Sequence, residues 1–135
     1  MNRVILFTKA PNLTNSKRRL KSFLSEKERL DLMKKLIKKN HKLIKESNFD
    51  YIIYYSGEKS DINFIDGKKK SQAGNGLGER MKNSIFNELN NTNKVVLMGS
   101  DLENLNLFHI NEAFDKLNDY DVVIAPSFDG GYGLI

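Results

Sequence analysis

The sequence predicts an α/β domain of three layers, in which a mostly parallel β-sheet is covered by helices on both faces. Short apolar runs typical of buried strands alternate along the chain with longer segments that have the roughly 3.6-residue periodicity of amphipathic helices. Most of these runs do not alternate between apolar and polar residues, which indicates strands buried on both faces. Repeated strand, helix and strand units imply right-handed crossovers between parallel strands.

The first third of the chain predicts one buried strand and one long helix. Residues 3–8 are rich in β-forming residues and run into a turn at Lys9-Ala10-Pro11. Ser25 and Glu28 have the spacing of a capping box, which begins a helix that extends to about residue 46. The apolar positions of this helix are Leu30, Met33, Leu36, Ile37 and Ile44.

The middle third predicts two further strands, a turn and a second helix. Residues 51–55 form a strand that closes at Ser56-Gly57, and residues 62–65 form a short third strand. A glycine-rich turn at residues 75–78 precedes a helix that ends at Asn90-Asn91. One face of this helix carries Leu77, Met81, Ile85 and Leu89.

The last third predicts a strand, a helix and a final strand. Residues 94–98 form a buried strand that runs into Gly99-Ser100-Asp101, and residues 122–125 form another before Pro126. The helix between them is marked by Ile110, Ala113, Phe114 and Leu117. We find no internal repeat and no linker, so residues 1–135 are expected to form a single domain.

The composition excludes several kinds of site. The chain contains no cysteine, which excludes disulfides, iron–sulfur clusters and thiolate zinc sites, and its two histidines exclude a histidine-rich metal site. Any metal is therefore expected to be bound by oxygen. The amino-terminal apolar run at residues 4–7 is too short for a signal peptide or a membrane span, so we expect a cytoplasmic protein.

The positive charge is concentrated at the beginning of the chain. Residues 1–45 hold 14 of the 22 basic and 3 of the 17 acidic residues, so this third carries +11 and the remainder −6. A basic segment suggests a polyanionic partner such as nucleic acid, a membrane surface or nucleotide phosphates. The long helix has no base-stacking aromatics and has the lysine spacing of any solvated helix, which argues against nucleic acid.

A ligand site is expected at the carboxyl edge of the sheet, where three polar segments should meet. They are residues 9–20, 99–105 and 127–132. In the first segment, the fixed charges of Lys9, Lys17 and Arg19 would cradle a diphosphate and stabilise charge on a phosphate leaving group. A solvated basic loop is the alternative interpretation.

Two isolated aspartates follow apolar runs at this edge. Asp101 comes after the small pair Gly99-Ser100, which lets a ligand approach the backbone, and it could bind Mg²⁺ or Mn²⁺ together with substrate phosphates. A helix N-cap is the alternative role for Asp101. Asp129 is a candidate site carboxylate, because Gly130 and Gly131 leave room for a sugar or phosphate. A hairpin turn is its alternative role.

Three other features are interpreted as structural. Asp119-Tyr120-Asp121 has the D-x-D spacing of a metal motif, but it precedes its strand and is expected at the opposite edge. Residues 74–78 look like a dinucleotide-binding glycine loop, yet the lysine-rich residues 68–70 precede them where a strand is required. His41 and His109 are expected to serve packing or solvation.

Four segments together resemble a bacterial family of GT-A-like transferases, usually labelled glycosyltransferase or rSAM/selenodomain-associated transferase and related to 2-phospholactate guanylyltransferases. Each motif alone is unspecific, but the four occur in the family's order and at matching intervals over nearly the whole chain. The segments are Lys9-Ala10-Pro11 with Lys17-Arg18-Arg19-Leu20, Gln72 with Leu77-Gly78-Glu79-Arg80-Met81, Gly99-Ser100-Asp101 with Leu105, and Ala125-Pro126-Ser127 with Asp129-Gly130-Gly131-Tyr132.

The resemblance implies a nucleotide-diphospho-sugar transferase fold that binds a divalent cation, Mg²⁺ or Mn²⁺. Asp101 would then ligate the metal, and Asp129, the candidate catalytic residue, would lie by the metal or the acceptor. The residues that face nucleotide phosphates would be Lys9, Lys17, Arg19, Arg80, Gly99 and Ser100. Those on the acceptor side would be Gly130, Gly131 and Tyr132.

The chain departs from the family pattern at Thr14, Arg18, Gly76 and Glu103, where the family commonly has glycine, threonine, an acidic residue and proline. It also ends at Ile135, whereas relatives continue well beyond the D-G-G-Y hairpin. We therefore expect a C-terminally truncated version of the fold. A fragment, a naturally shortened relative and an inactive descendant are the three interpretations of this length.

The function expected from the resemblance is metal-dependent glycosyl transfer from a nucleotide sugar to an acceptor. The alternative is nucleotidyl transfer, in which a phosphorylated acceptor attacks a nucleoside triphosphate and pyrophosphate leaves. A third interpretation, motivated by the basic first third, is a non-catalytic binding module. A truncated sheet would also leave an edge strand that can pair with a second copy, which suggests a homodimer.

Overall fold

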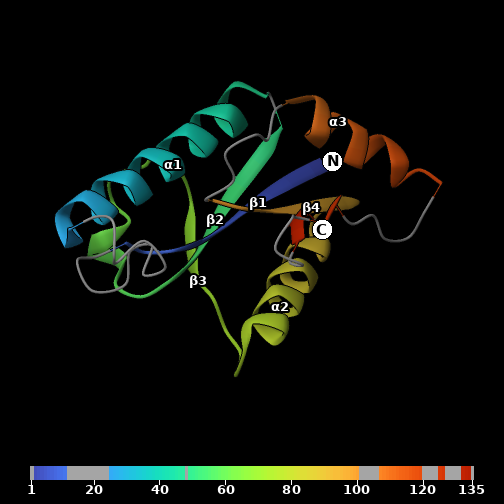
Figure 1. Cartoon of the computed structure of the whole chain (residues 1–135). Coiled ribbons are helices and arrows are strands. Elements are labelled where there is room, and N and C mark those ends of the chain that lie inside the picture. Colours follow the sequence, from blue (N-terminus) through green and yellow to red (C-terminus); the bar gives the residue numbers. More distant parts are fainter. Residues whose placement is uncertain are drawn as a thin grey trace.

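The helices and strands of a computed structural model alternate along the chain, as the sequence predicts (Figure 1). The structure describes residues 2–11, 25–47, 49–100, 107–119, 125–126 and 132–134. Its helices are α1 (Glu26–Glu46), α2 (Leu77–Leu89), α3 (Leu107–Lys116) and the short 3₁₀ helix η2 (Lys59–Asp61). Its strands are β1 (Asn2–Lys9), β2 (Asp50–Ser56), β3 (Lys69–Ser71), β4 (Lys94–Gly99), β5 (Ala125–Pro126) and β6 (Tyr132–Leu134).

The strands form one sheet with the order β3-β2-β1-β4-β6-β5. The first four strands of this order are parallel, whereas β6 pairs antiparallel with both β4 and β5. The prediction of a mostly parallel sheet is therefore confirmed. Because β1 lies between β2 and β4, the carboxyl ends of these three strands meet at one edge of the sheet.

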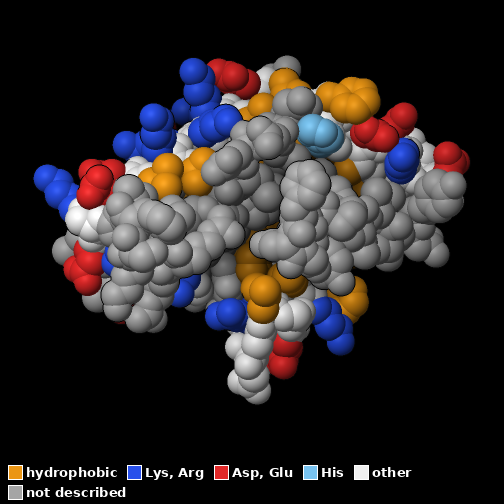
Figure 2. Space-filling view, viewed as in Figure 1, with side chains coloured by type: hydrophobic (Ala, Val, Ile, Leu, Met, Phe, Trp, Pro, Cys, Tyr) orange, Lys and Arg blue, Asp and Glu red, His pale blue; other side chains and the backbone are white. Residues whose placement is uncertain are grey.

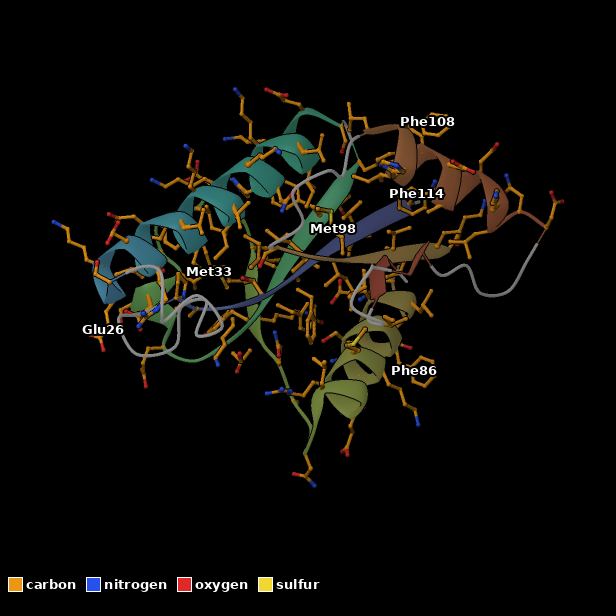
Figure 3. The ribbon with its side chains drawn as sticks, viewed as in Figure 1. Glu26, Met33, Phe86, Met98, Phe108 and Phe114 are labelled. Atoms are coloured by element: carbon orange, nitrogen blue, oxygen red, sulfur yellow. The ribbon has the colours of Figure 1, made fainter. Side chains whose placement is uncertain are left out.

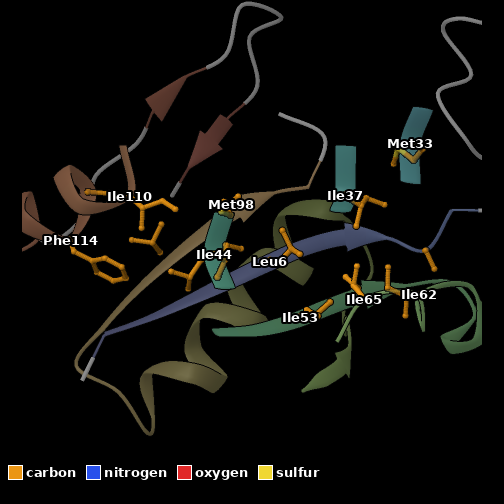
Figure 4. Packing of buried hydrophobic residues seen from close by; sticks show 14 residues of the cluster. Leu6, Met33, Ile37, Ile44, Ile53, Ile62, Ile65, Met98, Ile110 and Phe114 are labelled. Atoms are coloured by element: carbon orange, nitrogen blue, oxygen red, sulfur yellow. The ribbon is translucent and has the colours of Figure 1, made fainter. Parts of the chain in front are cut away.

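Helices cover both faces of the sheet, as predicted. Figure 1 shows α1 and α3 on one face and α2 on the other. The larger buried cluster lies under α1 and α3 and joins Ile37 and Ile44 of α1 to Leu6 of β1, Met98 of β4 and Phe114 of α3 (Figure 4). The smaller cluster, on the α2 face, consists of Ile5, Ile52, Tyr54, Val95 and Leu97, with Phe7, Met81 and Ile85 packed against it.

The predicted capping box begins α1. The Ser25 hydroxyl accepts the Glu28 N–H at 3.2 Å, and the Glu28 carboxylate accepts the Ser25 N–H at 3.1 Å. These two bonds satisfy backbone donors that the first turn of a helix leaves without partners. Farther along, the buried face of α1 includes the polar residues Asn40 and His41 between Ile37 and Ile44. The apolar pattern of α1 is therefore interrupted next to the sheet.

The third strand does not lie where the sequence predicts it. Residues 62–65 follow η2 in a turn, and Ile62 and Ile65 are buried in the larger cluster without forming a strand. The strand is β3, in the lysine-rich segment for which we expected none. As an edge strand, β3 gains hydrogen bonds from β2 through its backbone, while its side chains stay largely exposed. The glycine-rich residues 74–78 therefore do follow a strand, although one of only 3 residues.

The predicted final strand lies only partly within the described ranges. Ala125 belongs to β5, which extends to Pro126, while residues 120–124 lie outside these ranges. β5 and β6 are antiparallel neighbours, which is the arrangement of a hairpin. Residues 127–131, which include the predicted Asp129 turn, lie outside the described part of the chain.

The outer helix surfaces carry exposed aromatic residues. Phe86 of α2 and Phe108 of α3 are 56% and 67% exposed, whereas Phe114, also on α3, is buried (Figure 3). α3 is thus amphipathic, with one face packed on the sheet. None of the helices in the described ranges combines the length and the apolar character needed to cross a lipid bilayer.

Candidate functional site

The carboxyl edge of the sheet brings together residues that are distant in the sequence. Lys9, at the end of β1, is in register with Ser56 of β2, and Phe7 of β1 is in register with Gly99, at the end of β4. α2 follows β3 and therefore starts from the same edge, with Arg80 in its first turn. Four residues predicted to face phosphates thus belong to segments that meet at this edge: Lys9, Arg80, Gly99 and Ser100.

Lys9 contributes a positive charge to the edge. Its side chain is exposed, and no acceptor among the described residues pairs with its ammonium group. Ala10 is buried and donates its N–H to the Ser56 carbonyl at 2.8 Å, which extends the pairing of β1 and β2 beyond the strands. Gly57 permits this approach, because its φ is +93° and a Cβ there would lie 3.3 Å from the Ala10 Cβ.

A chain of hydrogen bonds joins three buried polar side chains at this edge. Ser100 Oγ donates to Thr8 Oγ1 at 2.7 Å, and Asn40 Nδ2 donates to the Ser100 carbonyl at 2.7 Å. Thr8, Asn40 and Ser100 are all at least 96% buried, with exposed fractions of 3%, 0% and 4%. The Ser100 hydroxyl is therefore used inside the protein, and the predicted approach of a phosphate to Ser100 would be to its backbone.

Gln72 ties the strand ends together from the side of β3. Its Nε2 donates to the carbonyl of Thr8 at 2.8 Å and to the carbonyl of Tyr54 at 3.1 Å. Its backbone N–H donates to the Tyr55 carbonyl at 2.8 Å. One side chain thus bridges the carboxyl-terminal ends of β1 and β2 and fixes their spacing.

The start of α2 is held close to the loop that precedes it. Asn83 Nδ2 donates to the Ala73 carbonyl at 2.9 Å. Gly74 has a φ of +138°, and a Cβ there would lie 3.0 Å from the Arg80 backbone nitrogen, so only glycine fits without strain. The Arg80 Nε is buried and has no acceptor among the described residues. A buried donor of this kind normally has a partner, which is consistent with the prediction that Arg80 faces an anion.

Several predicted site residues lie outside the described ranges. They are Lys17, Arg19, Asp101, Asp129, Gly130 and Gly131, and Tyr132 is described only as part of the backbone of β6. Within the described ranges, no three histidine or acidic side chains gather in a way that could hold a metal ion. Asp101, which directly follows Ser100 in the sequence, stays the predicted metal ligand, because a carboxylate supplies the oxygen that Mg²⁺ and Mn²⁺ prefer.

A second polar cluster lies at the opposite, amino edge of the sheet. The Glu88 side chain is buried at the end of α2 and accepts hydrogen bonds from the Tyr54 hydroxyl at 2.5 Å and from Arg3 Nη1 at 2.6 Å. Lys70 Nζ lies 3.3 Å from the same carboxylate. Arg3 also pairs with Asp50 at 2.7 Å. The cluster links β1, β2, β3 and α2.

The surroundings of Glu88 favour the ionised form of its buried carboxyl group. Burial alone would raise the pKa of Glu88, but the hydrogen bonds from Tyr54 and Arg3 and the charge of Lys70 outweigh it and hold this pKa below its ordinary value. Burial, together with the hydrogen bond to Glu88, raises the pKa of the Tyr54 hydroxyl. The pKa of Arg3 is raised, chiefly by its hydrogen bond to Glu88. Because the charge of Glu88 is balanced by neighbouring cations inside the protein, we interpret this cluster as stabilising the fold.

Two further features lie away from the carboxyl edge. A hollow of about 620 Å³ is lined by residues of the amino edge, among them Arg3, Asp50, Lys68 and Glu88, and by none of the predicted site residues. Lysines also gather on the outer surface of α1 (Figure 2), where Lys34 and Lys38 lie over the Phe64 ring at 5.6 and 5.8 Å. This basic surface has the lysine spacing of a solvated helix.

The roles of Thr8 and Asn40 at this edge were not predicted from the sequence. Thr8 was assigned only as the end of a buried strand. The signal for Asn40 was present, because a polar residue stands within the apolar stripe of the long helix, three residues after Ile37 and four before Ile44. Such a residue faces the sheet and needs a hydrogen-bond partner there.

The chain is similar to curated proteins described as 2-phospho-L-lactate guanylyltransferases. A 2-phospho-L-lactate guanylyltransferase from Methanocaldococcus vulcanius is 30% identical over 129 residues, which cover 91% of this chain and 56% of the relative. A 2-phospho-L-lactate guanylyltransferase from Methanobrevibacter ruminantium is 25% identical, over 97% of this chain and 62% of the relative. The chain therefore spans little more than half the length of the curated relatives it matches.

A solved structure has the same fold. It comes from Desulfovibrio desulfuricans G20 and is assigned provisionally as a nucleotide-diphospho-sugar transferase. The two chains superpose with a TM-score of 0.88 at 27% sequence identity, over 98% of this chain and 61% of the other. The predicted nucleotide-diphospho-sugar transferase-like fold, shortened relative to its homologues, is thus confirmed. Residues 41–135 match the family model of uncharacterized proteins conserved in bacteria, DUF2064, and the chain belongs to this family.

Proposed function

We propose that this chain carries the nucleotide-binding part of a metal-dependent nucleotidyltransferase whose donor is guanosine triphosphate. The observation that carries the proposal is the match to 2-phospho-L-lactate guanylyltransferases over 91% and 97% of the chain. This match favours nucleotidyl transfer over the glycosyl transfer that the motifs first suggested. The matched region includes the carboxyl edge with Lys9 and Ser100.

In the proposed reaction, a phosphate oxygen of the acceptor attacks the α-phosphorus of the triphosphate. A new P–O bond forms while the bond from the α-phosphorus to the bridging oxygen breaks, and pyrophosphate leaves with the electron pair. Negative charge builds on the leaving group, so a fixed cation lowers the barrier. The exposed ammonium of Lys9 suits this role, and we propose Lys17 and Arg19 for it from their place in the sequence.

Arg80 and Asp101 complete the proposed phosphate site. The buried Arg80 Nε, which has no described acceptor, would donate to a phosphate oxygen. Asp101 would hold Mg²⁺ or Mn²⁺ together with substrate phosphates, and this cation would neutralise charge on the transferred group. Gly99 would let the nucleotide approach the backbone. Asp129, followed by Gly130, Gly131 and Tyr132, is proposed to face the acceptor.

Pyrophosphate release tests this proposal. The purified chain, GTP, Mn²⁺ and a panel of phosphorylated hydroxy acids should give pyrophosphate in proportion to the acceptor consumed. Asp101→Asn should lower the rate by at least about a hundredfold, because it removes a metal ligand. Asp115→Asn, which changes an exposed carboxylate on α3, is the matched control and should keep the wild-type rate. Absence of pyrophosphate with every triphosphate and acceptor would refute the assignment.

Glycosyl transfer is the second candidate, favoured by the structural match to the Desulfovibrio desulfuricans protein. It would use the same edge and the same cation, but the leaving group would be a nucleoside diphosphate. A nucleotide sugar incubated with the chain and Mn²⁺ would then release a nucleoside diphosphate, and GTP would release no pyrophosphate. The two product assays therefore separate the two candidates.

A further inference from the structure

The hydrogen bond between Thr8 and Ser100 is unlike those of the other buried serine and threonine hydroxyls in the described ranges. Ser84 and Thr92 each donate to the carbonyl four residues earlier, in the same stretch of chain. Such bonds are local and are formed wherever a helix places a hydroxyl over its preceding turn. Thr8 and Ser100 are 92 residues apart and join the ends of two strands. This bond fixes long-range geometry.

The same bond belongs to a unit that crosses the carboxyl edge. Asn40 of α1 donates to the Ser100 carbonyl, Ser100 donates to Thr8 of β1, and Gln72 donates to the Thr8 and Tyr54 carbonyls. The unit therefore connects α1, β4, β1, β2 and the segment after β3. Figure 4 shows Ile37 and Ile44, which flank Asn40 on α1, packed over the sheet, with Ile44 beside Met98 of β4.

Packing alone does not explain polar side chains at this position. Burying an amide or a hydroxyl costs free energy that apolar side chains of similar size would avoid. Hydrogen bonds add direction, so they fix the spacing of the groups that they join more tightly than apolar contacts do. The unit lies where two chain segments leave the sheet. We call these two points the exits of the strands: the exit of β1 continues from Thr8 to Lys9, and the exit of β4 continues from Ser100 to Asp101.

We infer that Asn40, Ser100, Thr8 and Gln72 are positioning residues that set the distance between the phosphate-binding exit of β1 and the metal-binding exit of β4. This inference rests on the proposed function. A single metal-bound triphosphate must contact both exits, and an error of about 1 Å in such a site costs on the order of a hundredfold in rate. Residues behind metal ligands commonly change metal affinity or activity by about 10- to 100-fold when they are replaced.

Isosteric variants test the inference. Thr8→Val and Asn40→Leu remove the hydrogen bonds while keeping the number and branching of the side-chain heavy atoms, and Thr8→Ser keeps the hydroxyl. Thr92→Val is the matched control, because it removes a buried hydroxyl whose bond is local. Two quantities are measured for each folded variant: the affinity for GTP with Mn²⁺, and amide hydrogen exchange at residues 9–10 and 99–101, which requires no nucleotide.

Thr8→Val and Asn40→Leu are expected to weaken Mn²⁺-dependent GTP binding about tenfold and to speed amide exchange at both exits. Thr8→Ser and Thr92→Val should bind and exchange there like the wild type. Unchanged exchange and affinity in Thr8→Val, or an equal loss in Thr92→Val, would overturn the positioning role. A wild-type chain that binds no nucleotide would instead overturn the proposed function, and with it the purpose given to these residues.

Discussion

Replacing Tyr54 with phenylalanine removes one hydroxyl from the buried cluster at the amino edge and leaves the aromatic ring in place. This hydroxyl is the donor to Glu88 at 2.5 Å, and Tyr54 is only 1% exposed, so no water can reach the carboxylate from this side without a rearrangement. Glu88 keeps Arg3 and Lys70 as partners. The variant therefore tests a single charge-assisted hydrogen bond.

A hydrogen bond to a charged group contributes about 1.5–3 kcal/mol to stability. The loss should stay below the roughly 3–5 kcal/mol that follows when a buried charge loses its partner altogether, because two cations remain beside Glu88. We expect Tyr54→Phe to lower the free energy of unfolding by about 2 kcal/mol. For a chain of 135 residues this corresponds to a fall in Tm of about 7 °C.

Urea unfolding followed by circular dichroism measures this change, since the chain contains no tryptophan for fluorescence. Tyr55→Phe is the matched control, because Tyr55 is the next residue of β2, is only partly buried, and has no described hydrogen bond from its hydroxyl. The control should stay within about 0.5 kcal/mol of the wild type. If Tyr54→Phe also stayed within this limit, the cluster would not stabilise the fold in the way its geometry indicates.

Three further predictions concern other parts of the fold. Burial lowers the pKa of His41. The contribution of its neutral form to the stability of the fold is therefore fully present above the ordinary histidine pKa of about 6.5 and is lost as the pH falls below that value. An NMR titration midpoint of His41 at or above about 6.5 would contradict this. Gly74→Ala should destabilise the chain by at least about 1 kcal/mol, because Gly74 has a positive φ. Gly78→Ala should instead stabilise α2 by about 0.5–1 kcal/mol, because a Cβ at Gly78 would lie in open space. Denaturant midpoints that moved in the same direction for both variants would refute this contrast. Ile37→Ala, at a fully buried position, should cost about 2–5 kcal/mol in urea unfolding, and a loss below 1 kcal/mol would show that the α1 contact is loosely packed.

The sequence was sufficient to predict the elements whose side chains are buried in a regular pattern. β1, β2 and β4 are apolar runs because both of their faces are covered, and the capping box of α1 is readable from Ser25 and Glu28 alone. β3 escaped prediction because its strand character comes from backbone pairing with β2, and its side chains are lysines and a serine. The buried Ile62 and Ile65 suggested a strand, although they pack under α1 from a turn.

The candidate site was predictable only in part. Polar residues at strand ends predict that Lys9 and Gly99 share one edge of the sheet, because parallel strands end together, and the strand register places them there. The hydrogen-bond partners of Ser100 cannot be inferred from local sequence, because Asn40, which donates to its carbonyl, and Thr8, which accepts from its hydroxyl, are 60 and 92 residues away. For the same reason, the bond of the Ser100 hydroxyl to Thr8 was not predicted from the sequence.

Calorimetry measures most directly whether the carboxyl edge binds a triphosphate through a divalent cation. The purified chain is titrated with GTP in the presence and absence of Mn²⁺, and the titrations are repeated with Asp101→Asn and with the control Asp115→Asn. We predict binding that requires Mn²⁺, is lost in Asp101→Asn and is retained in Asp115→Asn. Absence of GTP binding by the wild type, or binding that is the same without Mn²⁺ and in Asp101→Asn, would contradict a metal-dependent nucleotide site at this edge.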